Sequence, residues 1–398
     1  MSLSWTAFAT RDLIAWHPLQ VSAIEPMKNS ELPAGERGAF NVDAGLSPTL
    51  PSRYYHDPQI HRQELDSIFH KSWCYVGHAS QLPNPGDYRV ERVADQCIFL
   101  VRDQDSTLNA FFNVCQHRGH ELLHGSGARK NRIVCPYHAW TYGLDGRLIQ
   151  APHTDQLQSF DAAEFALKPV ALANCGGLLF ANLDSTAADF ATDYPGLAQT
   201  FSDHLADFDR FGSAFQLDFD IAANWKIVVD NFSEGYHIPV AHKKLSRVLD
   251  NGTGKCGRLE QRYAFFESRS KAGFPGLELE PGSPYLSWTL WPNTCMLSLP
   301  GCQNLIVIRM EPNGPDRCRE RIDLLSVNGE VSPELEALRD LFADEFNAED
   351  IAIVESVHRG LGSLGYDQGR YVADDGDNWY SESGVHRFHQ QILAALDQ

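Results

Sequence analysis

The sequence lacks the excess of basic residues that proteins binding nucleic acids or anionic membranes usually carry. Its 398 residues include 52 acidic and 33 basic side chains, so the formal net charge is −19. Such a charge repels phosphate backbones and anionic lipid headgroups alike. We therefore expect neither nucleic acid nor a membrane surface to be a partner.

Long apolar runs are missing as well. No stretch approaches the roughly 20 apolar residues that span a bilayer, and Arg11 and Asp12 interrupt the N-terminal segment where the apolar core of a signal peptide would lie. We therefore expect a cytoplasmic protein. The nine cysteines are an odd number spread over the chain, which argues against a secreted disulfide framework.

The hydrophobic pattern divides the chain into four parts. Gly, Pro and Ser dominate the first part, the second predicts a helix capped by Asp57, and the third has short alternating runs between turns, typical of a small all-β domain. The fourth combines strands with helices, one of them over about 333–358, and predicts an α+β domain. In order, the parts are an extension (1–50), a helix that packs on the fourth part (51–75), the all-β domain (76–170) and the α+β domain (171–398).

Two cysteines and two histidines in the all-β part form a repeated ligand pattern. Cys115-x-His117 and Cys135-x-x-His138 are separated by seventeen residues. Each half offers one thiolate and one imidazole, which suits a Rieske [2Fe–2S] cluster, where one iron binds two cysteines and the other binds two histidines. A tetrahedral zinc site is the alternative, although common zinc motifs pair cysteine with cysteine and histidine with histidine.

His120 and His124 complicate this pattern. With His117 they are spaced as metal ligands on a helix often are. Gly119 and the turn "HGSG" argue against a helix here. We interpret both as surface histidines or as residues that support the ligands from outside.

A Rieske cluster transfers one electron at a time, so a second site should use the electrons. The candidate is "NWKIVVDNFSEGYHIPVAH". A helix that begins at Trp225 would place Asp230, Glu234 and His237 on one face and would end at Pro239.

Two histidines and one carboxylate form the facial triad of non-haem Fe(II) enzymes, which leaves positions open for O₂ and substrate. His237 supplies one histidine, and His242 supplies the other from a bent segment beyond the helix. For the carboxylate, chemistry alone leaves six candidates: Asp230, Glu234, Asp344, Glu345, Glu349 and Asp350.

The segments around these ligands resemble one known family. "NVCQHRGHELLHGSG" and "VCPYHAWTYGLDG" closely resemble the Rieske domain of the Rieske non-haem iron oxygenases, and the second candidate segment resembles their E-x-x-H-x₄-H element. The resemblance implies a mononuclear Fe(II) ion on His237, His242 and an aspartate from a late helix, which "AEDIAIVESVHRGL" identifies as Asp350. It also implies a [2Fe–2S] cluster bound by Cys115, His117, Cys135 and His138.

The resemblance assigns a different role to Glu234. In this family an acidic residue at that place connects the first iron-binding histidine to a cluster-binding histidine of the neighbouring chain, here His237 and His138. It further implies a helix-grip catalytic domain, head-to-tail assembly, usually as a trimer, and electrons from NADH or NADPH through a separate flavin/iron–sulfur reductase or a ferredoxin. We expect a solvated helix face formed by Asp344, Glu345 and Glu349.

The implied activity is that of a terminal oxygenase, a mono- or dioxygenase that uses O₂ to hydroxylate or demethylate a small molecule. Glutamate at the bridge position is similar to the choline, carnitine and glycine betaine oxygenases, whose cationic substrates bind well over aromatic faces. The alternatives are an aromatic-acid dioxygenase and, outside enzymes, an electron-transfer or zinc-stabilised binding protein. Candidate pocket residues are Phe232, Tyr236, Tyr285 and Trp291.

Two further patterns have a structural interpretation. In the strand "YLSWTLW", Tyr285 and Trp291 lie on one face and Trp288 on the other, so not all three can face a substrate. "GLGSLG", from Gly360 to Gly365, matches a dinucleotide-binding fingerprint, but a helix precedes it where the fingerprint requires a strand. We therefore expect a helix C-terminal turn, and no nicotinamide site in this chain.

Overall fold

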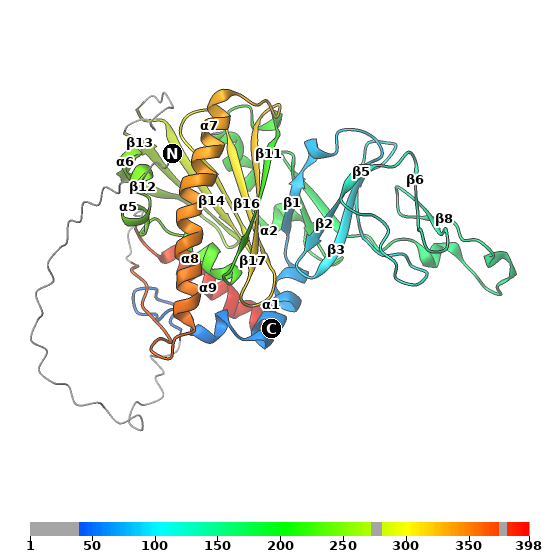
Figure 1. Ribbon diagram of the computed structural model, residues 1–398, viewed down its shortest axis with the longest axis horizontal. Helices are drawn as coiled ribbons and strands as arrows, with labels where there is room; N and C mark the ends of the chain where they lie inside the picture. Colours follow the sequence, from blue (N-terminus) through cyan, green and yellow to red (C-terminus); the bar gives the residue numbers. More distant parts are fainter. Residues whose placement is uncertain (1–39, 272–280, 374–379, 398) are drawn as a thin grey trace, which may run out of the picture. The chain divides into compact units, whose positions relative to one another are not determined.

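The computed structural model describes residues 40–271, 281–373 and 380–397. Contacts divide the chain into residues 1–37 and 38–398, and all described residues belong to the second unit. Most of the extension predicted over 1–50 therefore lies outside the described residues. Within these ranges the strands form four antiparallel sheets (Figure 1), and no helix is long and apolar enough to cross a membrane.

Two small sheets with a shared core form the predicted all-β domain. Their strand orders are β4-β3-β2-β5 and β6-β7-β8, and the core includes Phe99, Ile133 and Tyr142. The strands are β2 (Asp87–Val93), β3 (Gln96–Arg102), β4 (Leu108–Phe112), β5 (Ser126–Ala128), β6 (Arg132–Val134), β7 (Thr141–Gly143) and β8 (Leu148–Gln150).

A third small sheet joins a strand at the start of this domain to two strands that follow it. Its order is β1 (Cys74–His78), β10 (Leu178–Asn182) and β9 (Ala171–Cys175). Strands on both sides of residue 170 thus pair with each other, and the predicted boundary at that residue stays a prediction.

The second domain is built on a seven-stranded antiparallel sheet, which confirms the α+β class. Along the sheet, the strands are β11 (Phe211–Ile221), β17 (Cys318–Val327), β16 (Leu305–Pro312), β15 (Thr294–Ser298), β14 (Pro284–Leu290), β13 (Tyr263–Ser270) and β12 (Leu249–Leu259). As predicted, Tyr285 and Trp291 belong to the core on one face, and Trp288 belongs to the core on the other.

Helices cover both faces of this sheet. The face of Trp288 packs against α2 (Phe190–Asp193) and α3 (Leu197–His204). The opposite face, which α8 crosses in Figure 1, packs against α1 (Pro58–Ser67), α4 (Trp225–Phe232), α7 (Pro333–Leu341), α8 (Ala348–Leu361) and α9 (Ser383–Leu396). The short helices α5 (Ile238–Ala241) and α6 (Lys243–Val248) follow α4.

Capping residues explain where several helices begin. The Asp57 side chain accepts the Gln59 N–H at 2.7 Å and starts α1, as predicted. The Asn224 side chain accepts the Lys226 N–H at 3.1 Å and starts α4. The helix predicted over 333–358 forms, but a π-helical turn at Phe342–Asn347 separates α7 from α8.

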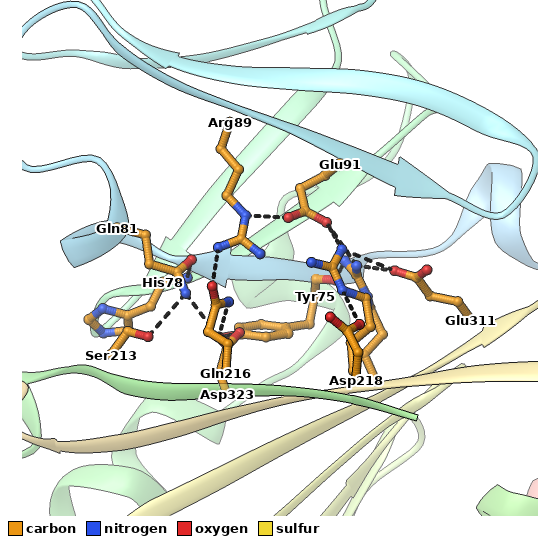
Figure 2. A network of polar contacts seen from close by, with 12 residues as sticks. Tyr75, His78, Gln81, Arg89, Glu91, Ser213, Gln216, Asp218, Glu311 and Asp323 are labelled. Carbon is orange, nitrogen blue, oxygen red and sulfur yellow. Dashed lines mark hydrogen bonds and ion pairs between the residues drawn. The ribbon is translucent and has the colours of Figure 1, made fainter. Parts of the chain in front are cut away.

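Figure 2 shows a buried network of polar contacts that joins the all-β domain to the seven-stranded sheet. Glu91 of β2 is 2% exposed, and Arg309 of β16 donates to it at 2.9 Å while Arg321 of β17 also donates to it. Burial favours the neutral acid, but these arginines hold the pKa of Glu91 below its usual value. Arg89 of the same strand contacts this carboxylate as well, so arginines from both domains stabilise the charge of Glu91.

Asp323 of β17 completes this network. It accepts hydrogen bonds from the Tyr75 hydroxyl at 2.8 Å, from Gln81 at 2.9 Å and from Gln216 of β11 at 2.6 Å. Tyr75 and Gln81 belong to the segment that opens the all-β domain, so both domains contribute donors. We call Glu91, Arg309, Arg321 and Asp323, together with these donors, the interdomain network.

Candidate functional site

Two turns with the same backbone carry the four residues predicted to bind a cluster. Between β4 and β5, the Gly119 N–H donates to the Cys115 carbonyl at 3.0 Å, and the Cys115 N–H donates to the carbonyl five residues later at 2.8 Å. Between β6 and β7, Ala139 and Cys135 repeat both bonds at the same distances. Gly119 and Ala139 both have positive φ, 75° and 56°. Because the two turns share this backbone, each presents one thiol and one imidazole, although the histidine follows the cysteine by two residues in the first turn and by three in the second.

Of these four side chains, the two thiols lie together and the two imidazole rings lie together. Cys115 and Cys135 are each 2% exposed, and burial, together with contact with the Cys115 thiol, raises the pKa of the Cys135 thiol. The rings of His117 and His138 are exposed, with centroids 4.7 Å apart. A thiol pair thus lies beneath an imidazole pair that reaches the surface.

This separation fits a [2Fe–2S] cluster, in which one iron takes both thiolates and the other takes both imidazoles. In a zinc site all four donors would surround one ion, whereas the described group that lies close enough together to hold a single ion has three donors and is at a different site. The Tyr142 hydroxyl lies 3.3 Å from Cys115 Sγ, and the His117 ring stacks on Trp140 with centroids 4.8 Å apart. Both contacts hold the donors in place.

His120 and His124 lie beside this arrangement. His124 is exposed, and its Nδ1 lies 3.6 Å from the Glu121 carboxylate. The Nδ1 of His120 faces the Glu121 carbonyl oxygen. Neither ring joins the facing pair of histidines.

His237, His242 and Asp350 come together at the second site. His237 precedes α5, His242 lies between α5 and α6, and Asp350 lies in the first turn of α8. One donor atom of each lies within 4.8 Å of the others, and Asp350 Oδ1 is 2.9 Å from His242 Nε2. The Asn231 amide donates to the same oxygen at 2.7 Å. The donor set is that of a non-haem Fe(II) triad.

Two more carboxylates orient the histidine rings. Glu234 Oε1 lies 2.6 Å from His237 Nδ1, and Glu349 Oε2 lies 2.7 Å from His242 Nδ1. Glu349 is exposed, as expected of a solvated helix face, and its carboxylate also contacts His242. Although burial opposes protonation, hydrogen bonds to Asp350 and Glu349 raise the pKa of His242. The same negative surroundings favour a divalent cation.

The helix that precedes His237 ends earlier than the sequence predicts. α4 ends at Phe232, and the Ser233 hydroxyl donates to the carbonyl four residues back at 2.7 Å. The Glu234 side chain then accepts the N–H of His237 at 3.1 Å, which forms a turn in place of another helical turn. Pro239 therefore does not end this helix, and it lies in the first turn of α5.

Asp230 consequently does not share a face with His237. It stays on α4, where its carboxylate accepts the Tyr55 hydroxyl at 3.1 Å and lies 2.8 Å from His389 Nε2. Of the six carboxylate candidates, Asp350 is the one that joins the two histidines. Asn231 was missed as a partner of the site, because nothing in its spacing distinguishes it from neighbouring polar residues. Glu349 was one of the six carboxylate candidates, but it contacts His242 Nδ1 and does not join the two histidines.

A cavity adjoins Glu234, and we call it the near cavity. Phe232 and Tyr285 line it, Tyr236 is 51% exposed, and Trp291 lines an adjoining cavity instead. The near cavity is completed by Ser233, Gly235, Ile238, Phe266, Ser287 and Ser381.

The glycine pattern at 360–365 lies where α8 ends, at Leu361, and the residues after it form turns. It follows a helix, as predicted, and lacks the strand that a dinucleotide fingerprint needs in front of it.

Comparison with protein families matches both domains. Residues 72–161 match the Rieske [2Fe–2S] domain, and residues 208–398 match the catalytic domain of the ring hydroxylating alpha subunit. The carnitine monooxygenase oxygenase subunit of Acinetobacter baumannii is 35% identical, over 90% of this chain and 97% of its own. The chloroplastic choline monooxygenase of Amaranthus tricolor is 31% identical, over 89% of this chain and 79% of its own.

Solved structures show the same fold. The quaternary ammonium Rieske monooxygenase CntA in complex with L-carnitine matches with a TM-score of 0.80 and 33% identity, over 89% of this chain and 97% of that one. Naphthalene 1,2-dioxygenase from Rhodococcus matches with a TM-score of 0.74 at 20% identity, over 88% of this chain and 95% of that one, which supports the fold alone.

Proposed function

Because the chain belongs to the family of Rieske, or ring-hydroxylating, oxygenase α subunits, we propose that it is the terminal oxygenase of a system that oxidises a quaternary ammonium compound. One observation carries the proposal: a single chain holds a paired thiol–imidazole site and a separate His–His–carboxylate site. The names of the relatives at 31–35% identity support the substrate class.

The proposed reaction converts a C–H bond of the substrate into C–OH. Substrate, O₂, two electrons and two protons give the hydroxylated product and one water. When bound, the cluster supplies single electrons and the iron ion binds and activates O₂. Hydroxylation of an N-methyl group leads to cleavage of the C–N bond, with release of formaldehyde and the demethylated amine.

The residues around the iron triad would orient it and exclude water. Glu234 and Glu349 fix the rings of His237 and His242 by accepting their Nδ1–H groups, which leaves both Nε2 atoms for a metal. His242 is 2% exposed, so its donor nitrogen lies away from bulk water.

The near cavity suits a cation. Phe232, Phe266 and Tyr285 supply aromatic faces, and Glu234 supplies a carboxylate. A trimethylammonium group has no hydrogen-bond donor and binds through such faces and through charge. The net charge of −19 agrees with a cationic substrate.

Glu234 would also connect the two metal sites across a subunit boundary. Its Oε1 contacts His237 within the chain, and the exposed ring of His138 is accessible to a second copy. A head-to-tail homo-oligomer, a trimer by family resemblance, would bring them together. Electrons would come from NADH or NADPH through a separate reductase or ferredoxin, in the cytoplasm.

The test is turnover by the iron-loaded protein with NADH and an electron-donating reductase. We expect about three irons per chain, two from the cluster and one from the triad, and formaldehyde or hydroxylated product from carnitine, choline or glycine betaine. If product forms only from aromatic acids, the substrate is an aromatic acid and not a quaternary ammonium compound. Two irons and no product would reduce the protein to an electron carrier, and a colourless zinc-loaded protein would overturn the proposal.

A further inference from the structure

A buried glutamate of the sheet contacts the chain just before the helix turn that carries Asp350. Glu320 of β17 is 1% exposed, and the alternation of side chains along a strand places it on one face with Cys318 and Ile322, which belong to the core beneath α8. Its carboxyl accepts the side-chain amide N–H of Asn347 at 2.7 Å. Asn347 is also 1% exposed and precedes Asp350 by three residues. The contact therefore joins the sheet to the start of α8.

Among the described residues no cation compensates Glu320, and this distinguishes it from the buried carboxylate of Glu91. Arg309 and Arg321 form ion pairs with Glu91 and help to hold its pKa below the usual value. A buried carboxylate without such a partner is costly, so burial favours the neutral acid. Glu320 is therefore expected to keep its proton where Glu91 loses it.

The groups that face Glu320 strengthen this preference. They are Asp350 from α8, the Cys295 thiol from β15 and the Cys318 thiol from its own strand. Burial raises the pKa of both thiols, so both are neutral. Burial, together with the negative charge of Asp350, raises the pKa of Glu320 to about 7, although the hydrogen bond from Asn347 acts in the opposite direction.

The amide of Asn347 offers an acceptor for the proton of Glu320. Its Nδ2 donates to Glu320, but its Oδ1 is buried and has no hydrogen-bond partner among the described residues. An ionised carboxylate can only accept hydrogen bonds, whereas a neutral carboxyl has one O–H to donate. A protonated Glu320 can donate to Oδ1 while it accepts from Nδ2. The acid and the amide then match at two points.

The place of Asn347 in the chain connects this contact to the iron triad. Asn347 ends the π-helical turn Phe342–Asn347, and α8 begins directly after it. Successive residues of a helix are rotated by about 100°, so ending this turn one residue earlier or later would point Asp350 away from His237 and His242. The Asn347 side chain makes no capping bond to α8 and contacts β17 instead. This contact holds the turn in its register.

We propose that Glu320 is a neutral carboxylic acid joined to the Asn347 amide by two hydrogen bonds, and that this acid–amide pair positions Asp350 at the iron triad. Glu320 is then a positioning residue that touches neither the metal ion nor the substrate. The inference rests on the proposed function, because it concerns the iron site of that function. The pair itself forms before iron binds.

Glutamine is the decisive replacement, because its amide can donate to Oδ1 and accept from Nδ2 but cannot ionise. Full-length protein with its cluster is loaded with ferrous iron, and retention of the mononuclear iron against a chelator is measured. We expect Glu320→Gln to retain iron like the unmodified protein. Glu320→Leu and Asn347→Leu remove the pair and should each lower the affinity by about 10-fold. Glu330→Gln, at an exposed glutamate just beyond β17, is the control and should change nothing.

An equal loss of iron in Glu320→Gln and Glu320→Leu would mean that an ionised carboxylate is required, and it would overturn the proposal. Unchanged retention in both leucine variants would overturn the positioning of Asp350.

Infrared spectroscopy before iron is added tests the proton directly, since the carbonyl stretch of a neutral carboxylic acid is separate from carboxylate bands. At about pH 6, the spectrum of the unmodified protein should show this band relative to Glu320→Gln, and the band should fade as the pH rises through about 7. Glu330→Gln should keep it. Absence of the band in a protein that holds three irons overturns this inference alone. If the band is present but no third iron binds, the proposed function fails, and the positioning of Asp350 fails with it.

Discussion

The two proposed metal-binding regions differ in how far apart their donors lie along the chain. The cluster donors fall between Cys115 and His138, on two turns with the same backbone bonds. The iron triad joins His237 and His242 to Asp350, more than a hundred residues later. The first region is thus organised by local hydrogen bonds, whereas the second depends on the packing of α8 against α4.

The difference extends to the surroundings. The cluster thiols lie inside the all-β domain and the rings of His117 and His138 are exposed. At the iron triad each histidine ring is held by its own carboxylate, and His242 is 2% exposed. The cluster region is suited to exchange electrons with a partner, and the triad region is suited to hold a reacting molecule away from water.

The largest expected effect comes from removing a triad donor. Asp350→Ala should abolish binding of the mononuclear iron and lower product formation by roughly 1,000-fold or more, because two imidazoles alone hold the ion poorly. The two cluster irons and their visible absorbance should remain. Loss of both metals in this variant would mean that the two regions fold as one unit.

Glu234→Gln tests whether the two regions communicate through this side chain. The amide keeps one acceptor near His237 but loses the charge, so both metals should stay bound while product formation falls by about 100-fold. The rate at which O₂ oxidises the reduced cluster in the presence of substrate should fall in parallel. Glu345→Gln, at a surface ion pair with Lys244, is the control, and full activity in the Glu234 variant would exclude the connection.

Glu349→Gln should have a smaller effect. Its carboxylate is half exposed and contacts only the far side of the His242 ring, so the affinity for the mononuclear iron should fall by about 10-fold. Iron retention against a chelator measures this change, with Asp344→Asn as the control. Unchanged retention would show that the Glu349 contact does not orient His242.

The smallest effect concerns the two cluster turns. Gly119 has φ 75° with open space around a Cβ, so Gly119→Ala should cost about 1 kcal/mol through the backbone alone. Ala139→Gly should relieve a similar strain but increase the stability by less than about 1 kcal/mol, because glycine also gives the unfolded chain more freedom. The temperature at which the cluster absorbance disappears reports both changes. If both substitutions shift this temperature equally and in the same direction, the two turns are not equivalent.

Local patterns made the grouping of the four proposed cluster donors predictable. The spacing around Cys115 and Cys135 contains the whole site, and the start of α1 follows from Asp57 in the same way. The α+β class was also predictable, because strand and helix periodicity persist through the second half of the chain.

Features that arise from packing between distant segments were not predictable. The end of α4 depends on hydrogen bonds of Ser233 and Glu234 that compete with another helical turn. The contact of Glu349 with His242 depends on how α8 is rotated, and its sequence neighbour Asp350 looks equally acidic. The interdomain network joins Glu91 to Arg309, which lie 218 positions apart.

The interdomain network sets a condition for exchanging domains between proteins of this kind. A transplanted all-β domain that keeps Glu91 and meets a sheet without Arg309 and Arg321 would bury this carboxylate with Arg89 of its own strand, so that part of the compensation for its charge would be lost. The graft would have to carry matching residues on β16 and β17 of the recipient. Exchange of the two domains between such proteins would therefore have to move Glu91 together with its partners on β16 and β17.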